Sequence, residues 1–434
     1  MDPLDPSWSR TVTDPAALVL DAVAELTEPL LDELAMLVRI PSVSGTDAEN
    51  DAQAHVAARF AAAGLDVDHW PIDLTAVSAN PDFPGMEVER REAWGLVGRL
   101  PGSGDGTTLM LNGHIDVVPV GDPDVWTAPP FSADIRAGCL HGRGSCDMKA
   151  GLVASLWAVR ALRMAGVRLR GDVVLASVQG EEDGGLGTFA TLQRGWRADA
   201  CVIPEPTQLD VVPANSGALT FRLRIRGRAT HAARRTDGVS AIEKFWPVWQ
   251  ALADLERRRH ESVDPLVARW PLAHPLSIGQ IRAGDWASSV PDLLVAEGRL
   301  GVAIGESTDH ARADLEDAIA DACERDPWLR EHPVDVEWWG GQFASGRIPA
   351  GSDLVDRVRA AHRIASGDRP QDVYGAPYGS DLRLLTGLAG IPTLQYGPGD
   401  ARLAHGPNEA VPLADFATTA RTLALVALDV CGAH

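Results

Sequence analysis

Apolar positions in the first half of the chain fall into short runs, separated by stretches with helical spacing. Four runs are almost continuously apolar, as in strands buried on both faces: 94–100, 108–111, 172–178 and 200–203. Helical patterns occupy 14–39, 50–63, 147–165 and 188–195. Asp14 is expected to cap the first helix, and residues 73–91 show no period and are expected to form a loop. Alternating strands and helices predict a mostly parallel sheet covered by helices on both faces.

A different pattern begins near Asn215. From 218 to 226, apolar and polar residues alternate strictly, which predicts a strand with one buried and one solvated face. The segments that follow predict a helix at 240–258, strands at 276–281 and 293–304, a helix at 308–325 and a strand at 334–339. This β-α-β-β-α-β order is that of a ferredoxin-like unit, small enough to be an inserted domain.

The α/β pattern resumes after this unit. It predicts a helix at 353–364, a short helix from Asp381, a strand at 393–396 and a final helix at 413–430. Residues 1–214 and 341–434 are therefore expected to form one α/β domain, and residues 215–340 an inserted α+β domain. The length of 434 residues agrees with two domains, because single cores usually stop growing below that size.

Charge and composition narrow the class of protein. The formal charge of −21 disfavours nucleic acid or an anionic membrane surface as a partner. No apolar run reaches the roughly 18 to 20 residues that cross a bilayer. The N-terminal residues 1–6 lack the basic and apolar regions of a signal peptide. The five cysteines are scattered and odd in number, which argues against a disulfide framework and predicts a cytoplasmic location.

Residues that could carry chemistry follow the predicted strand ends. They lie in five short segments: His114-Ile-Asp116, Gly142-Arg-Gly-Ser-Cys-Asp147-Met-Lys, Gln179-Gly-Glu181-Glu182-Asp183, Pro204-Glu205-Pro-Thr207 and Ala404-His405-Gly-Pro-Asn-Glu409. Each segment alone has a simpler interpretation. The acidic run could be a solvated turn, Asp147 could cap the helix that it opens, and His405 could be a surface residue. Because the ends of parallel strands converge on one edge of a sheet, the segments together predict a common site.

Two imidazoles among several carboxylates suit zinc or a similar divalent ion. They exceed the needs of one tetrahedral ion and match two ions about 3.5–4 Å apart, bridged by a carboxylate. Such a pair lowers the pKa of a bound water towards about 7 and polarises an amide carbonyl. A carboxylate that is not a ligand could then move a proton from the water to the leaving amine.

The five segments, in this order, resemble the M20 family of co-catalytic zinc amidohydrolases, and within it the acetylornithine deacetylase and succinyl-diaminopimelate desuccinylase branch. The resemblance covers residues from about 31 to 425. It implies a mostly parallel-sheet zinc-hydrolase catalytic domain with the inserted ferredoxin-like domain as a lid. Two Zn²⁺ ions per subunit are expected, with Co²⁺ or Mn²⁺ as possible replacements.

The resemblance also implies roles for individual residues. His114 and Glu205 would bind one ion, Glu182 and His405 the other, and Asp147 would bridge them. Asp116 would hydrogen-bond His114 and fix its tautomer, and Glu181 would be the general base and then the general acid.

The inserted domain supplies further candidates. The segment Gly227-Arg-Ala-Thr-His231-Ala resembles a family segment whose histidine reaches the substrate carbonyl, often from the partner subunit of a dimer. Arg299 could clamp a substrate carboxylate or be a solvated strand arginine. Ser380 and Arg383 lie in a segment that resembles a loop lining the family's pocket. Ser288 stands where the family usually has an asparagine, which affects the substrate-binding roles and leaves the metal site untouched.

The predicted function is metal-dependent hydrolysis of the amide bond of a small N-acyl amino acid, as in a deacetylase or desuccinylase. A dipeptidase or carboxypeptidase of the same family is the alternative, because the same attack by water cleaves any amide. A non-catalytic binding protein on the same fold is a second alternative. A homodimer formed through the lid is expected from the resemblance.

Overall fold

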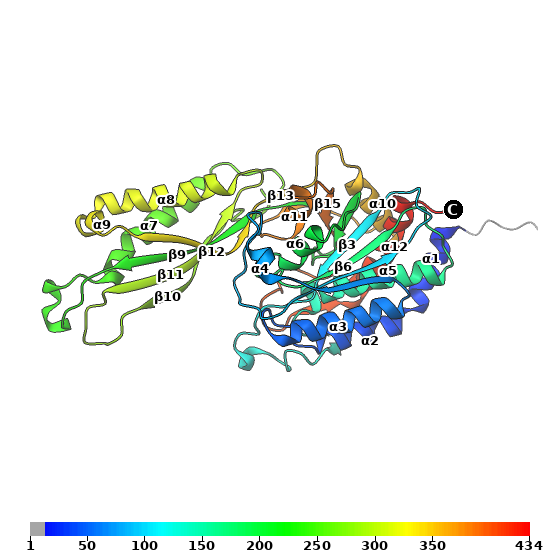
Figure 1. The fold of residues 1–434 in the computed structure, drawn as a ribbon, viewed down its shortest axis with the longest axis horizontal. Helices are drawn as coiled ribbons and strands as arrows, with labels where there is room; N and C mark the ends of the chain where they lie inside the picture. Colours follow the sequence, from blue (N-terminus) through cyan, green and yellow to red (C-terminus); the bar gives the residue numbers. More distant parts are fainter. Residues whose placement is uncertain (1–13) are drawn as a thin grey trace, which may run out of the picture.

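The computed structural model describes residues 14–434 and consists of two lobes (Figure 1). The larger lobe is built on a nine-stranded sheet, in which the pairs β6–β3, β3–β7 and β7–β15 are parallel. Its strands, in spatial order, are β1 (Asp66–Pro71), β2 (Trp94–Leu100), β6 (Val173–Val178), β3 (Leu109–His114), β7 (Ala200–Ile203), β15 (Thr393–Gln395), β8 (Val211–Asn215) and β13 (Gly346–Arg347), with β14 (Val373–Ala376) beside β8. The expected α/β class with a mostly parallel central sheet is confirmed.

Helices cover both faces of this sheet. They are α1 (Pro15–Glu25), α2 (Thr27–Val38), α3 (Asp47–Ala62), α4 (Leu74–Ser78), α5 (Ala150–Met164), α6 (Leu186–Gln193), α10 (Leu354–Ser366), α11 (Leu382–Gly387) and α12 (Leu413–Cys431). Successive residues of β3 point to opposite faces, so Leu109 and Leu111 pack with α5 and α12 while Met110 packs with α6. Burial on both faces explains why the strand is apolar along its length.

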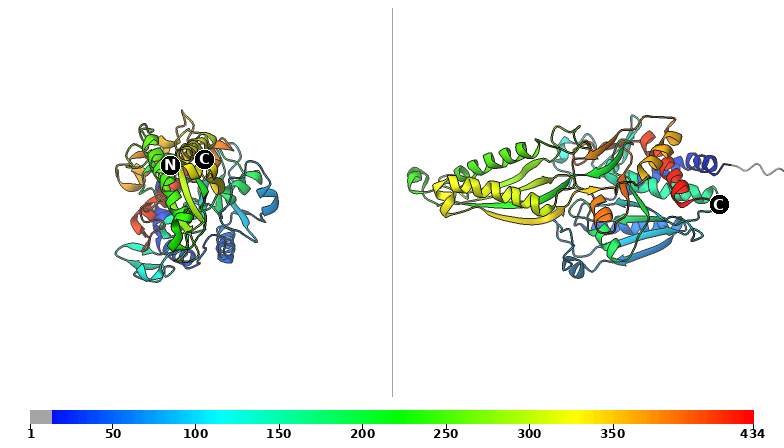
Figure 2. Two further views of the ribbon diagram at one scale, coloured as in Figure 1. Left: turned by 90° about the vertical axis from the view of Figure 1, so that its left-hand side faces the viewer. Right: turned by 90° about the horizontal axis from the view of Figure 1, so that it is seen from above.

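The smaller lobe carries a separate four-stranded antiparallel sheet, in the order β10-β11-β9-β12 (Figure 2). Its elements are β9 (Gly217–Arg226), α7 (Ala241–Arg259), β10 (Leu276–Ala283), β11 (Leu293–Val302), α8 (Thr308–Arg325), α9 (Pro327–Glu331) and β12 (Asp335–Phe343). Two residues of β9, Phe221 and Leu223, are fully buried under α7 and α8, while Arg224 on the other face pairs with Glu337. We refer to this lobe as the lid.

The helix expected at 14–39 is two helices, which meet at Leu26. Asp14 caps the first one as expected, because its side chain accepts a hydrogen bond from the main chain of Ala16. The segment expected to be a loop contains α4. The patterns also missed the five-residue β8. They missed the small sheet of β4 (Asp134–Arg136), β5 (Cys139–His141) and β16 (Ala410–Pro412) too, because its three-residue strands carry almost no period.

Residues 1–6, in which the sequence lacks the regions of a signal peptide, lie outside the described residues. The domain boundaries at 214/215 and 340/341 stay predictions. Among residues 14–434, no helix combines the length and the apolar character that crossing a membrane requires.

Candidate metal centre

The site lies where the central parallel strands end. His114 is the last residue of β3, Glu181 and Glu182 follow β6, and Glu205 follows β7. These three strands are neighbours and run in the same direction, so their carboxyl ends meet at one edge of the sheet. Asp147 lies in the turn Ser145–Lys149 before α5. His405 lies in the loop between β15 and β16.

A close approach of two segments brings Glu205 to this edge. Gly151 in the first turn of α5 packs against Pro204, and a Cβ added at Gly151 would lie 1.9 Å from the Pro204 carbonyl oxygen. A glycine at this position therefore lets the segment that carries Glu205 approach the helix that follows Asp147.

The side chains form two groups of possible metal ligands. His114, Asp147 and Glu205 make the first group, in which Nε2 of His114 is 3.1 Å from Oδ1 of Asp147 and 3.9 Å from Oε1 of Glu205. Asp147, Glu182 and His405 make the second group. There Nε2 of His405 is 2.9 Å from Oε2 of Glu182 and 3.5 Å from Oδ2 of Asp147.

Asp147 belongs to both groups and offers a different oxygen to each. This is the arrangement that a carboxylate bridging two ions requires. Each group presents one imidazole and two carboxylates, a donor set that suits zinc and similar divalent ions. The residues therefore fit a pair of divalent cations.

The charges of the site agree with cation binding. Burial raises the pKa of Glu205 well above its usual value, and the neighbouring Asp147 carboxylate adds to that rise. Burial also raises the pKa of Glu182, again with repulsion from Asp147. Burial opposes ionisation of Asp147 too, but hydrogen bonds from His114 and His405 hold its pKa below the ordinary value. Crowded, buried carboxylates that repel one another are stabilised by a cation between them.

Glu181 belongs to neither group. Its Oε2 is 4.0 Å from Nε2 of His114, and the residue is 8% exposed. Burial raises the pKa of Glu181 well above its usual value; His114 opposes the rise, and the nearby carboxylate of Asp381 adds to it. A carboxyl group with a raised pKa beside a metal site can accept a proton and later return it.

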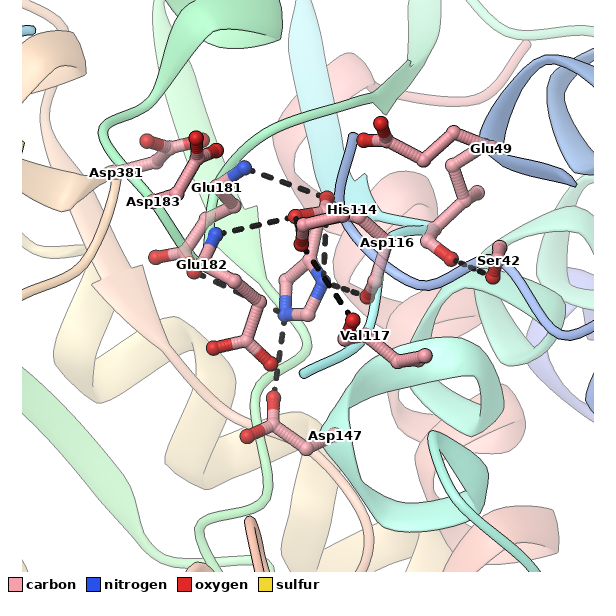
Figure 3. A network of polar contacts seen from close by, with 12 residues as sticks. Ser42, Glu49, His114, Asp116, Val117, Asp147, Glu181, Glu182, Asp183 and Asp381 are labelled. Atoms are coloured by element: carbon pink, nitrogen blue, oxygen red, sulfur yellow. Dashed lines mark hydrogen bonds and ion pairs between the residues drawn. The ribbon is translucent and has the colours of Figure 1, made fainter. Parts of the chain in front are cut away.

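Asp116 differs from its predicted role. Nδ1 of His114 donates to the main-chain oxygen of Asp116 at 2.9 Å, while the nearest carboxylate oxygen is 3.8 Å away. The carboxylate instead accepts hydrogen bonds from the main-chain nitrogens of Glu181 and Glu182 (Figure 3). It also accepts one from the hydroxyl of Ser44. The tautomer of His114 is still fixed, because a carbonyl can only accept, but the carboxylate positions the Glu181–Glu182 turn.

A cavity of about 220 Å³ opens over the site. The residues that line it are Asp147, Glu181, Glu182, Glu205, Pro206, Arg299, Phe343, Tyr378, Gly379, Ala401, Ala404 and His405. Arg299 comes from the lid and lies with its guanidinium 5.8 Å from the centre of the Phe343 ring. Phe343 was not among the predicted site residues, since a single aromatic residue in β12 carries no motif signal. Tyr378 opens the segment 378–383 that resembles the pocket-lining loop, but Ser380 and Arg383 were the contacts predicted from it.

The other predicted substrate contacts lie elsewhere. Ser380 is buried and accepts a hydrogen bond from Gln395, and Arg383 donates to the carbonyls of Ser380 and Gly184. Neither lines the cavity, because both side chains are used to hold the loop behind it. His231 is exposed in the lid, where its Nδ1 accepts from the main chain of Ala233, and it does not line the cavity of its own chain.

Sequence patterns also missed a buried ion network behind the Glu181–Glu182 turn. Arg90 makes paired hydrogen bonds to Glu49 and to Asp183, and all three side chains are almost fully buried. Asp183 also accepts from the main chain of Glu87 and Val88. The position of Asp183 in the acidic run was the only signal, and it does not reveal the partner, which lies 93 residues earlier.

The fold and the two groups of possible ligands are those of a metal-dependent hydrolase, with two carboxylates and an imidazole in each group. Residues 110–429 match the model of peptidase family M20/M25/M40, and the chain belongs to that family.

Similar proteins support the same class of metal-dependent hydrolase. The N-formyl-4-amino-5-aminomethyl-2-methylpyrimidine deformylase of Halalkalibacterium halodurans is 29% identical over 429 residues, covering 93% of this chain and 95% of that protein. The deformylase of the same name from Bacillus subtilis is 30% identical over 380 residues, covering 81% and 82%. The structure of human carnosine dipeptidase 1 shares the fold, with a TM-score of 0.76 and 15% identity over 96% of this chain and 99% of that one.

The predictions of the family, of an enzyme and of amide hydrolysis are therefore confirmed, and the family implies a divalent metal. The alternative of a non-catalytic binding protein finds no support in these comparisons.

Proposed function

We propose that this protein removes a small acyl group from an amine with two bound divalent ions, zinc foremost, and that formyl is the first acyl group to test. The observation that carries the proposal is the sharing of Asp147 between two ligand groups, with Glu181 beside them and in neither. The names of the two deformylases support formyl. The earlier expectation of an N-acyl amino acid is thus widened to N-acyl amines.

Water and the amide are the only reactants that the proposed chemistry consumes. Bound ions would polarise the amide carbonyl and ready a water for attack. The carboxylate of Glu181 takes a proton from that water as the oxygen of the water bonds to the carbonyl carbon. The same carboxyl group then gives the proton to the leaving nitrogen as the carbon–nitrogen bond breaks, which yields a carboxylic acid and an amine.

The cavity supports a small substrate. A volume of about 220 Å³ is below the usual range of about 300–1,000 Å³ for sites that bind drug-sized ligands. Phe343 and Tyr378 offer apolar surface for the part of the substrate that leaves, and Arg299 offers a charged group for an anionic substituent.

A dipeptidase or carboxypeptidase is the second candidate. Arg299 is the observation that favours it, because a guanidinium at the cavity wall suits the free carboxylate of a peptide. The likeness to human carnosine dipeptidase 1 supports only the fold.

We further propose a homodimer formed through the lid, in which His231 of one subunit serves the site of the other. His231 is exposed and does not line the cavity of its own chain, as this proposal requires. The five unpaired cysteines support a location in the cytoplasm, where thiols stay reduced.

A comparison of the native enzyme with Glu181→Gln tests the proposal. Both are loaded with Zn²⁺, Co²⁺ or Mn²⁺, the bound metal is counted, and hydrolysis of N-formyl, N-acetyl and N-succinyl amines and of dipeptides is measured. Glu181→Gln is expected to keep its metal and to lose at least about 10²-fold in kcat, because the proton carrier is gone. Asp124→Asn, an exposed residue, is the control. Unchanged turnover in Glu181→Gln would remove this residue from the mechanism.

A further inference from the structure

We propose that the buried ion pair between Arg143 and Glu409 positions the second group of ligands, so that losing the pair weakens binding of the second ion more than of the first. The inference rests on the two-ion site proposed above. Arg143 and Glu409 are positioning residues, because neither lines the cavity and both side chains are almost fully buried.

Glu409 holds the turn that carries Asp147. One oxygen of its carboxylate accepts from the main-chain nitrogens of Cys146 and Asp147, at 2.9 and 3.0 Å. The other accepts from the main-chain nitrogen of Gly144 at 3.0 Å and from Nη1 of Arg143 at 2.7 Å. The main chain at Asp147 has φ −113° and ψ 97°, which is not helical. Glu409 therefore does for this turn what regular helical hydrogen bonds do elsewhere.

Arg143 extends the same contact to the loop of His405. Its Nη1 donates to the carbonyl of Gly406 at 3.1 Å, and its Nη2 donates to the carbonyl of His405 at 3.2 Å. His405 has φ +62°, a left-handed conformation that is unfavourable for a residue with a side chain. Its side chain is 52% exposed, the largest exposure among the five proposed ligands, so packing holds it little. Hydrogen bonds from Arg143 to the loop carbonyls hold the left-handed main chain of His405 in place and compensate for the weak packing of its side chain.

The contacts of Arg143 are unevenly divided between the two ion positions. His114 and Glu205 are placed by β3 and β7, and neither touches the Arg143–Glu409 pair. Arg143 donates to the carbonyl of His405 itself, which belongs only to the second group, whereas its one contact on the side of the first group is a longer bond of 3.4 Å to the carbonyl of Pro119, five residues after His114. Loss of Glu409 would affect the shared Asp147 and therefore both ions. A substitution of Arg143 is therefore the one that distinguishes binding of the second ion from binding of the first.

The experiment titrates metal-free enzyme with Co²⁺ and with Zn²⁺ by calorimetry, and follows the visible spectrum of Co²⁺. Arg143→Met is expected to bind the second ion about 10- to 100-fold more weakly, the usual effect of losing a residue that supports ligands, with the first ion changed less than about threefold. Arg143→Lys should recover part of the loss, since it keeps the charge but not the forked geometry. Arg402→Met is the matched control, because Arg402 is exposed on the loop of His405 and pairs only with Asp400.

If the wild type binds two ions, Arg143→Met must bind the second one more weakly than the first. Equal loss of affinity for both ions, or no loss for either, would overturn this inference and leave the proposed function intact. A wild type that binds fewer than two ions would overturn the two-ion site and this inference together. Circular dichroism of the metal-free variants shows whether they fold. If Arg143→Met does not fold, Arg143→Lys and Glu409→Gln carry the test, and full affinity for the second ion in both would contradict the inference.

Discussion

Nδ1 of His114 donates a hydrogen bond to the main-chain oxygen of Asp116 at 2.9 Å. The ring therefore turns Nε2 toward the metal position, whatever the side chain at position 116 is. In the metal-free site this nitrogen hydrogen-bonds Asp147, and it must give up its proton to bind an ion. The Asp116 carboxylate is free for another task, which is to hold the main chain of Glu181 and Glu182.

Asp116→Asn should therefore separate metal binding from turnover. We expect affinity for the first ion to change by less than about tenfold, and kcat to fall about 10- to 100-fold because the turn that carries Glu181 loses its anionic acceptor. Metal titration and steady-state kinetics on the same preparation check both. Loss of the first ion in Asp116→Asn would instead point to the carboxylate as the partner of the imidazole.

Metal binding should release protons. Attraction by Glu182, assisted by Asp147 and opposed by burial, raises the pKa of His405 to about 11, so this imidazole is protonated in the metal-free enzyme at neutral pH. An ion needs the lone pair of that nitrogen, and each proton displaced makes the apparent affinity rise about tenfold per pH unit up to that pKa. Calorimetry in buffers with different ionisation enthalpies counts the protons. His405→Gln should release fewer protons when it binds metal. An affinity for the metal ion that falls as the pH rises would contradict the prediction.

Removing Arg90 should destabilise the fold strongly. Glu49 and Asp183 would remain buried without their partner, and we expect Arg90→Met to lose about 3–5 kcal/mol of unfolding free energy. Arg90→Lys should lose less, since one ammonium cannot pair with two carboxylates as a guanidinium does. Arg99→Met removes a partly exposed arginine that pairs with Asp66 and, at 3.5 Å, with Asp172, and it should lose less than about 1 kcal/mol. Urea denaturation of the metal-free proteins gives all three values.

The proposed exchange of His231 between subunits can be tested by mixing. His231→Ala and Glu181→Gln homodimers should each be nearly inactive. Random reassociation would place one intact site in each mixed dimer, so activity should return to about a quarter of the wild type. Activity that stays at the level of the parents after verified subunit exchange would place His231 outside the catalytic machinery.

The sequence predicted much of the site because its ligands follow parallel strands. His114, Glu182 and Glu205 are fixed by the ends of β3, β6 and β7, which have a strong apolar pattern and lie side by side. Asp147 and His405 could be placed only by their motifs, since a non-helical turn and a loop with a left-handed residue have no period.

Long-range polar contacts could not be predicted in the same way. Arg90 lies in a segment without hydrophobic periodicity, and its position depends on two carboxylates from α3 and from the turn after β6. Ser380 and Arg383 show the opposite error. Their segment resembles a pocket-lining loop, and Tyr378 and Gly379 do line the cavity, but hydrogen bonds to Gln395 and Gly184 hold Ser380 and Arg383 behind that lining, with Arg383 against the ring of Phe343.

The second ligand group includes a residue that is made late. All of the first group is complete by residue 205, whereas His405 comes 200 residues later, after the whole lid. A nascent chain on the ribosome therefore holds every side chain of the first group long before it holds the last side chain of the second, His405.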